Sequence, residues 1–148
     1  MFEKIYGQAM VEGEPLPFAL PAWLALAPFE EYLGMRIETA ADGRALLSMP
    51  FTVAHAQGWG LMHGGAVTAL ADTAVAIAMK TLLPEGSKFA TVEMGLVFHA
   101  PVRGGSVRAE ARVVERQERT LRGEAEVFDS HGSKVASFHA TFKVKRQG

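Results

Sequence analysis

The chain has 148 residues, of which 49% are hydrophobic and 21% are charged, and its formal net charge is −1. This length suits one domain with a sizeable core, and the near-neutral charge gives no electrostatic reason to expect nucleic acid or an anionic membrane as a partner. Because the chain contains no cysteine, disulfides, thiolate–zinc sites and a cysteine nucleophile are excluded.

The start of the chain and its hydropathy predict a cytoplasmic protein. The opening residues, MFEKIYGQAMVEGE, lack the long apolar stretch of a signal peptide. No stretch reaches the roughly 18 apolar residues that a membrane-spanning helix needs. We expect residues 1–20 to form an N-terminal arm and residues 21–148 to form a single domain.

The next segments predict short helical pieces followed by a hairpin. Residues 21–34, PAWLALAPFEEYLG, begin with a proline suited to a first helical turn and end at a glycine suited to a C-cap. Pro28 favours two short pieces over one long helix, because proline breaks a helix interior. Asp42-Gly43, between MRIETA and RALLSMP, is a strong signal for a tight β-hairpin turn.

The most hydrophobic segment predicts one long buried helix. The stretch GWGLMHGGAVTALADTA (58–74) opens with glycines, and residues 66 to about 83 then contain neither glycine nor proline. These residues form about five helical turns that are apolar nearly all round, a pattern typical of a helix buried on most sides. Pro84-Glu85-Gly86 ends the helix.

The last 60 or so residues alternate between apolar and polar side chains, which predicts four antiparallel strands with one wet face. In FATVEMGLVFHA we expect one face to carry Ala90, Val92, Met94, Leu96 and Phe98. An all-round apolar helix needs a curved sheet to wrap it. The predicted fold class is therefore α+β, with two strands, one central helix and then four strands in a curved antiparallel sheet.

Asp72 is an acid within this apolar helix. A buried carboxylate is costly unless it is paired, hydrogen-bonded or functional, and no cation lies one turn away in the sequence. One interpretation is a functional acid. The alternative is a solvated stripe that Asp72 shares with Thr68, Thr73 and Lys80, and spacing alone does not separate the two.

His63-Gly64-Gly65 stands at the start of the same helix. The first amides of a helix have no internal partner and carry the positive end of its dipole, and glycines let a carbonyl oxygen approach them. This arrangement is suited to stabilising an oxyanion. The alternative is a glycine-rich turn with a histidine cap.

The spacing of these two features has a consequence for assembly. Gly64 and Asp72 lie eight residues apart, which is roughly 12 Å along one helix. One activated carbonyl group cannot touch both residues of the same chain. If both residues act on it, the site is shared between two copies of the protein in a homodimer.

The motif HGG followed by LADTA, and then TVEMGLVFHAPVRGG, resembles the hotdog-fold acyl-CoA thioesterases. The nearest likeness is to the phenylacetate-pathway type, and a more distant one is to the 4-hydroxybenzoyl-CoA thioesterases. The resemblance covers about residues 30–146 and fits the strand pattern. It implies a hotdog fold, an acyl-CoA substrate without a metal or cofactor, since coenzyme A is part of the substrate, and dimers that form a long shared sheet and pair into tetramers.

The resemblance also assigns roles to individual residues. Asp72 is the implied catalytic carboxylate, as nucleophile or general base, and the amide of Gly64 holds the oxyanion. Gln57, seven residues before that glycine, is expected to orient water or substrate, and His63 to shape the loop. Some relatives place Thr or Ser one turn after the acid, where this chain has Ala76, so a water held by that hydroxyl must be held otherwise.

Further candidates follow from position. The residues expected to contact substrate are Gly65, Trp59, Met62, Thr73 and His55. Solvated or core positions are the simpler interpretation for His99, His131, His139, Arg103, Arg116, Arg119, Arg122, Phe89 and Phe98, although an arginine suits a coenzyme A phosphate and the phenylalanines suit an acyl pocket.

The function expected from these residues is hydrolysis of a small-to-medium acyl- or aryl-CoA thioester. Two alternatives stay open. One is a hotdog hydratase or dehydratase, whose His-and-acid motifs are not found in this chain. The other is a hotdog protein that binds acyl-CoA without turnover, which the alanine at position 76 favours.

Overall fold

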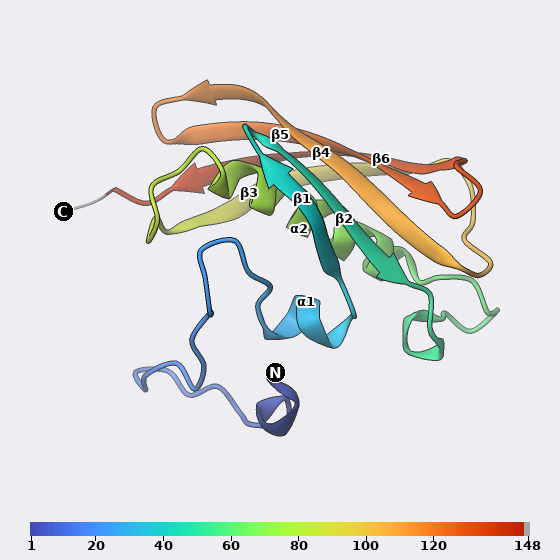
Figure 1. Ribbon diagram of the computed structural model, residues 1–148, viewed down its shortest axis with the longest axis horizontal. Coiled ribbons are helices and arrows are strands. Elements are labelled where there is room, and N and C mark those ends of the chain that lie inside the picture. The colour runs from blue at the N-terminus through green and yellow to red at the C-terminus, as the bar shows by residue number, and fades with distance from the viewer. Residues whose placement is uncertain (147–148) are drawn as a thin grey trace.

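The computed structural model describes residues 1–146, and its strands form one six-stranded sheet in the order β1-β2-β4-β5-β6-β3, with antiparallel neighbours throughout. The sheet curves over the long helix α2 (Figure 1). The strands are β1 (Arg36–Ala41), β2 (Arg44–Pro50), β3 (Phe89–Phe98), β4 (Ser106–Gln117), β5 (Thr120–Asp129) and β6 (Lys134–Val144). The helices are α1 (Pro28–Tyr32), α2 (Gly64–Lys80) and the short 3-10 turns η1 (Glu3–Ile5) and η2 (Val53–His55). The predicted order of two strands, one central helix and four strands is confirmed.

The β1–β2 hairpin turns at Asp42-Gly43, as the sequence predicts. Both residues have positive φ, 53° and 77°, which a tight two-residue hairpin turn of the mirror-image type requires. Gly43 also donates its N–H to the hydroxyl of Thr81 at 2.7 Å. This bond ties the hairpin to the point where α2 ends.

Helix α2 begins two residues earlier and ends three residues earlier than predicted. At its start, Nδ1 of His63 accepts the N–H of Gly65 at 2.8 Å, so the cap draws both glycines into the helix. At its end, the Thr81 hydroxyl donates to the carbonyl of Ala78 while it accepts from the hairpin. The chain leaves the helix there, ahead of the proline.

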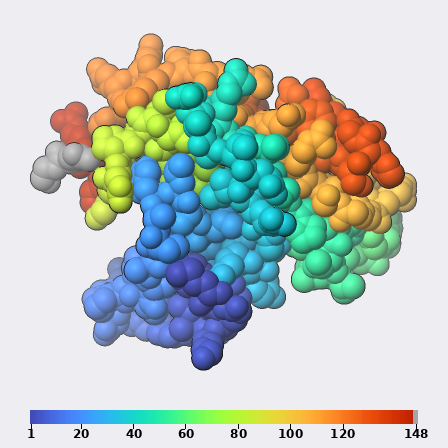
Figure 2. Space-filling model, viewed as in Figure 1, coloured from blue at the N-terminus to red at the C-terminus, as the bar shows by residue number. Residues whose placement is uncertain are grey.

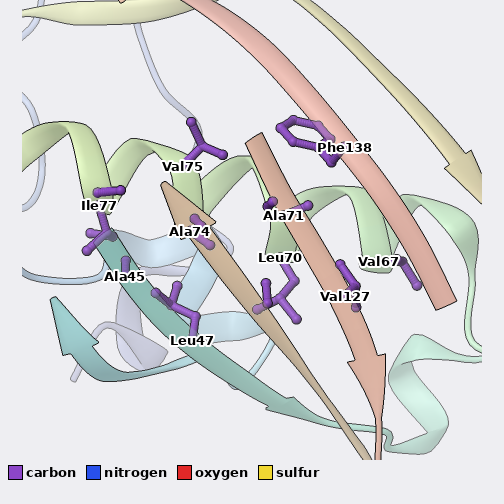
Figure 3. Close-up of a cluster of buried hydrophobic side chains, with 14 of the residues drawn as sticks. Ala45, Leu47, Val67, Leu70, Ala71, Ala74, Val75, Ile77, Val127 and Phe138 are labelled. Atoms are coloured by element: carbon purple, nitrogen blue, oxygen red, sulfur yellow. The ribbon is translucent and has the colours of Figure 1, made fainter. Parts of the chain in front are cut away.

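The core lies between α2 and the concave face of the sheet. Leu70, Ala71 and Ala74 on α2 are fully buried against Leu47 of β2 and Val127 of β5 (Figure 3). The small alanines let the strands approach closely. The opposite face of the sheet carries the cross-strand ion pairs Arg112–Glu124, Arg122–Glu115 and Lys134–Glu126.

Helix α2 packs closely against β5 at Gly123. A Cβ on this glycine would lie 2.5 Å from Cγ1 of Val75 and 3.2 Å from the carbonyl oxygen of Arg112. The absence of a side chain at Gly123 therefore sets how deeply α2, which carries Asp72, sits in the sheet.

Strand β3 differs from its predicted pattern. The pairing of β3 with β6 shifts register between Thr91 and Glu93, so the strand contains a bulge. After the bulge the alternation changes phase. The residues opposite the inward side chains of β6 are Phe89, Thr91, Met94, Leu96 and Phe98, so the prediction that Ala90 and Val92 share this face is wrong.

The N-terminal residues form a lobe that projects from the sheet-and-helix body (Figure 2). Only α1 is helical in residues 21–34, so the prediction of a first helical piece before Pro28 is wrong. Ala27 is extended, as a residue before proline prefers, and the indole N–H of Trp23 donates to the carbonyl of Lys80 at 2.9 Å. This contact with α2 replaces a local helical turn. In residues 1–146, no helix is long and apolar enough to cross a membrane.

Candidate active site

Asp72 lies in a groove rather than on an open surface stripe. The groove has a volume of about 270 Å³ and runs along one face of α2, past Asp72, Thr73 and Ala76 to Lys80. The β3 residues 89–91 form one wall, and residues between 20 and 30 form the other. Asp72 and Glu30 both line this groove, and a carboxylate that faces a groove is placed where it can act on a bound molecule.

Thr91 holds the carboxylate in place. Its hydroxyl donates to Oδ1 of Asp72 at 2.9 Å, which leaves Oδ2 for a reaction. Alternation along the sequence does not predict a role for Thr91, because it places this residue on the outer face of the sheet. The bulge in β3 turns it toward α2. The sequence offers one signal for Thr91 as a partner of Asp72, namely a polar residue between apolar neighbours.

Three effects act on the ionisation of Asp72. Burial in the groove is the largest and raises the pKa of this carboxyl group, because the charged form loses water. The hydrogen bond from Thr91 lowers the pKa, and the negative charge of Glu30 raises it. The net result is a pKa above the ordinary value of an aspartate, so the carboxylate is more basic than in water.

The start of α2 borders a second cavity, of about 430 Å³, which is lined by residues that include Gln57, Met62, Gly64 and Phe98. The Phe98 ring lies against Gly64, where an added Cβ would come within 2.9 Å of it. Among the contacts of residues 1–146, the amide of Gly64 has no protein acceptor. It is therefore free to donate to a ligand.

The other residues of the HGG motif have structural partners. The N–H of Gly65 is taken by His63, so His63 caps the helix and Gly65 has no amide proton left for substrate. Oε1 of Gln57 accepts the backbone N–H of Trp59 and, at 3.4 Å, that of Leu61. The oxygen of Gln57 is thus held by the loop, and its NH2 group is the end that a ligand can meet.

The remaining candidates divide by position. Met62 lines the cavity at the helix start, and Thr73 lines the Asp72 groove. Trp59 is 91% exposed and lines neither. His55 is buried: its Nδ1 accepts the N–H of Thr52 at 2.9 Å, and its Nε2 donates to the carbonyl of Leu33 at 2.6 Å. Both ring nitrogens are satisfied, so His55 fixes the loop and does not face a ligand.

Among the histidines and arginines of the described residues 99–146, one lines either cavity. His99 lines the cavity at the helix start and bonds the hydroxyl of Ser137 at 2.8 Å. Arg116 donates to the carbonyl of Leu82, and Arg122 pairs with Glu115. These contacts account for the two arginines as parts of a solvated surface.

The two cavities have no lining residue in common, although both border β3. Phe98 at one end of this strand lines the helix-start cavity, and Phe89 at the other end lines the Asp72 groove. Within one chain Gly64 and Asp72 therefore border separate cavities, in agreement with their roughly 12 Å spacing along α2.

Comparison with known proteins shows the family of the chain. The family model described as "Thioesterase superfamily" matches residues 60–136, the segment that begins just before the HGG motif and ends in β6. The proofreading thioesterase EntH of Klebsiella pneumoniae is 31% identical over 106 residues, which cover 72% of this chain and 77% of that protein.

Two solved structures are similar over most of their length. A variant of the phenylacetic acid degradation protein PaaI from Thermus thermophilus has a TM-score of 0.73 and 31% identity, and the match covers 79% of this chain and 98% of that one. The conserved protein PA5202 from Pseudomonas aeruginosa has a TM-score of 0.78 and 28% identity, with coverage of 81% and 95%.

A curved antiparallel sheet wrapped around one central helix is the hotdog fold. The chain belongs to the thioesterase superfamily, in the class of hotdog enzymes that hydrolyse acyl-CoA thioesters.

Proposed function

We propose that the protein hydrolyses a small-to-medium acyl- or aryl-CoA thioester to the free acid and coenzyme A. Asp72 is the catalytic carboxylate and the amide of Gly64 from a second protomer is the oxyanion donor. The observation that carries the proposal is the half-buried Asp72, held by Thr91 in a groove of its own, together with the unpartnered amide at the start of α2.

The reaction requires a negative charge to form on the thioester oxygen. As a general base, Oδ2 of Asp72 takes a proton from water while the water oxygen bonds to the carbonyl carbon. The amide of Gly64 donates to the developing oxyanion. Collapse of this intermediate breaks the C–S bond, and the sulfur leaves with the proton that Asp72 took up. As a nucleophile, Asp72 instead bonds to the carbonyl carbon while the C–S bond breaks and the coenzyme A thiolate leaves, and water then hydrolyses the resulting mixed anhydride.

The shared site needs a homodimer that joins the two β3 strands. In this chain β3 lies at an edge of the sheet and pairs only with β6. Its exposed side chains include Val92, Val97 and Phe98, which are more than half exposed. An apolar strand edge is a template for pairing with another chain. Antiparallel pairing of two β3 strands sets Phe98 of one protomer near the Phe89 end of the other, and so joins the two half-sites.

The named relatives support this chemistry. EntH is named a proofreading thioesterase, and PaaI a phenylacetic acid degradation protein. Gln57 lies on the same cavity as Gly64, where its NH2 group suits the thioester oxygen. Ala76 offers no hydroxyl, and Thr91 supplies one to the carboxylate from the opposite wall instead.

The test is thiol release from a panel of acyl- and aryl-CoA thioesters. We expect turnover by the wild type and a loss of about 10²- to 10⁴-fold in kcat for Asp72→Asn, because this is the usual contribution of a general base. The control is circular dichroism of both proteins, which shows that the fold persists. Full activity of Asp72→Asn excludes the proposed acid, and tight binding of the esters by the wild type without turnover identifies a binding protein.

A further inference from the structure

The wall of the Asp72 groove opposite β3 is formed by residues 20–30, which we call the strap. The β3 wall is fixed by its hydrogen bonds to β6. Residues 20–27 of the strap belong to no helix or strand, and only its last residues join α1. The strap therefore depends on contacts with α2 to stay beside Asp72.

Trp23 and Lys80 form a reciprocal contact that holds the strap on α2; we call it the clasp. The indole N–H of Trp23 donates to the carbonyl of Lys80 at 2.9 Å, and Nζ of Lys80 donates to the carbonyl of Trp23 at 3.0 Å. Nζ also lies 4.6 Å from the centre of the indole ring, within the range of a cation–π interaction. Within residues 1–146, these two hydrogen bonds are the ones that join residues 20–26 to the rest of the chain.

The clasp lies two helical turns from Asp72 and reaches it through the strap. Asp72 and Lys80 are eight residues apart, which is roughly 12 Å along α2. The strap ends beside the groove at Glu30, whose Oε1 accepts the N–H of Ala27 at 3.2 Å. Among the described residues that line the groove, the charged side chains besides Asp72 are Glu30 and Lys80. The strap thus brings Asp72 both a cover against water and one negative charge.

Both contributions of the strap act in the same direction on Asp72. Burial, to which the strap contributes one wall, is the largest effect and raises the pKa of this carboxyl group, and the charge of Glu30 raises it too. The Thr91 hydroxyl on the β3 wall lowers this pKa and does not depend on the strap. A nearby cation such as Lys80 also favours the carboxylate. The sign of a change at Asp72 therefore distinguishes a displaced strap from a lost positive charge.

We propose that Trp23 and Lys80 are positioning residues, whose clasp holds the strap over α2 so that the strap keeps water from the Asp72 carboxylate. This inference rests on the proposed function, because it gives the clasp a part in preparing Asp72 as the catalytic base. The clasp acts from two turns away, through the position of the strap.

Two substitutions open the clasp from opposite sides in the full-length protein. Trp23→Phe keeps an aromatic ring against the core but has no N–H for the carbonyl of Lys80. Lys80→Met keeps an unbranched side chain but has neither the donor nor the charge. We expect chymotrypsin to cleave within the strap about fivefold faster in each variant, which is the effect of losing one hydrogen bond on a local opening. Circular dichroism checks that the sheet and α2 persist.

The decisive readout is the titration of the Asp72 carboxyl group, followed by carbon NMR. We expect both variants to move this titration to lower pH, because water returns to the groove and the Glu30 charge moves away. The acidic limb of kcat/KM should move in the same direction. A clasp that serves stability alone leaves both curves in place, which would contradict the proposal.

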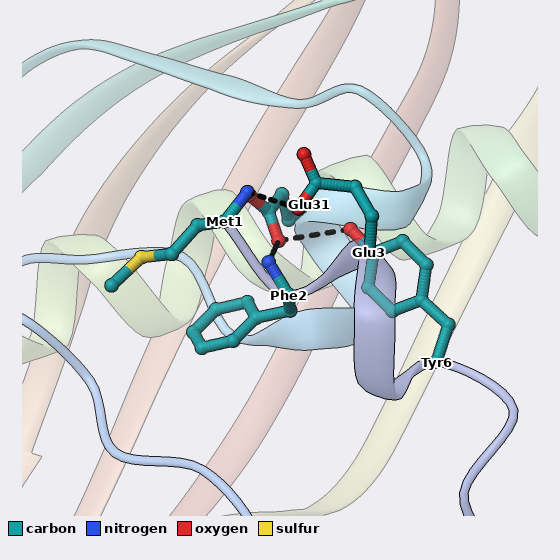
Figure 4. Close-up of polar contacts among 5 residues, drawn as sticks. All are labelled: Met1, Phe2, Glu3, Tyr6 and Glu31. Carbon is teal, nitrogen blue, oxygen red and sulfur yellow. Dashed lines mark hydrogen bonds and ion pairs between the residues drawn. The ribbon is translucent and has the colours of Figure 1, made fainter.

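Two control variants match these substitutions. Tyr6→Phe removes a hydroxyl that donates to Glu31 at 2.8 Å, on the side of α1 where Glu31 also accepts the N–H of Phe2 (Figure 4). Lys134→Met removes a lysine that pairs with Glu126 on the outer face of the sheet. We expect neither control to move the titration.

The outcomes separate this inference from the proposed function. An Asp72 titration that moves to higher pH in Lys80→Met, stays in place in Trp23→Phe, or moves equally in Tyr6→Phe overturns the role of the clasp, while Asp72-dependent hydrolysis by the wild type stands. A wild type that hydrolyses no thioester, combined with a titration that both clasp variants move to lower pH, overturns the hydrolysis and leaves the clasp as the support of a buried acid.

Discussion

Asp72 and Thr91 form a pair in which the Thr91 hydroxyl holds the proposed catalytic carboxylate and lowers its pKa against the larger effect of burial. The sequence alone singles out Asp72, since a carboxylate within an apolar helix is costly without a purpose. Thr91 lies 19 residues further along the chain, on another element, and a bulge decides which way it points. A bulge depends on how two strands fit together, so the alternation of one strand cannot predict it.

Replacing Thr91 tests this division of roles. Loss of its hydrogen bond removes an effect that lowers the pKa of Asp72, so this pKa rises further. We expect Thr91→Val to move the acidic limb of the kcat/KM profile to higher pH and to lower the plateau about tenfold, as for one hydrogen bond to a charged group.

Thr91→Ser is the matched control for this change, because it retains the hydroxyl. We expect its pH profile to overlay that of the wild type. A Thr91→Val profile that drops uniformly without moving along the pH axis would show that Thr91 serves packing alone.

The same acid should weaken the fold. Burial raises the pKa of Asp72 above its unfolded value, so the native state binds this proton more tightly than the unfolded chain. The resulting contribution to stability is present at acid pH and is lost as pH rises through the folded pKa. Asparagine carries no charge at any pH.

We therefore expect the free energy of unfolding of Asp72→Asn to exceed that of the wild type at neutral pH. The difference should shrink as the pH falls toward the ordinary aspartate pKa of 3.8. Urea denaturation across this range measures it. A variant that is less stable than the wild type at neutral pH contradicts the burial of a costly charge.

At the scale of elements, the periodicity of the sequence predicts the regular strands and the central helix. It does not predict features that depend on one tertiary contact, such as the ends of a helix. The four C-terminal strands, the Asp42-Gly43 turn and the central helix follow from residue spacing. The first and last residues of α2 do not follow from residue spacing, because the His63 cap and the Thr81 hydroxyl fix them. Trp23 likewise leaves its predicted helical turn to bond Lys80 on α2.

The seating of α2 in the sheet has its own test. Gly123→Ala places a methyl group against Val75 and the β4 backbone, so we expect a loss of about 1–3 kcal/mol in the free energy of unfolding. Gly104→Ala is the control, because nothing lies within 4 Å of its added Cβ, and its change should stay within about 0.5 kcal/mol.

A double variant makes the contact specific. Val75→Ala removes the methyl group that the new Cβ meets, so Val75→Ala with Gly123→Ala should lose less stability than the two single losses combined. Strict additivity in denaturant unfolding contradicts a direct contact between α2 and β5 at this point.

At the scale of the whole molecule, the two proposed half-sites lie in separate cavities of one chain. The Asp72 groove and the cavity at Gly64 share no lining residue, and both open beside the edge strand β3. The helical rise alone predicted this separation. The N-terminal lobe, by contrast, lies outside the motif-bearing segment, and its packing on α1 through Glu31 gave no sequence signal.

The two half-sites can be disabled separately. Gly64 is the first residue of α2, where proline fits the helix but has no N–H, so Gly64→Pro removes the oxyanion donor. Gly64→Ala is the matched control: its Cβ meets the same Phe98 ring, but its N–H remains. The activity that Gly64→Pro loses beyond Gly64→Ala measures the contribution of the amide N–H, because both variants crowd the Phe98 ring.

The central claim, one thioester site built from two protomers, is tested most directly by mixing these defects. Asp72→Asn and Gly64→Pro chains are unfolded together and refolded as mixed dimers, and thiol release is measured. Random pairing puts half of the dimers in the mixed form, each with one intact site, so we predict recovery of about a quarter of wild-type activity from two inactive proteins. Mixed dimers that form and remain inactive contradict the shared site.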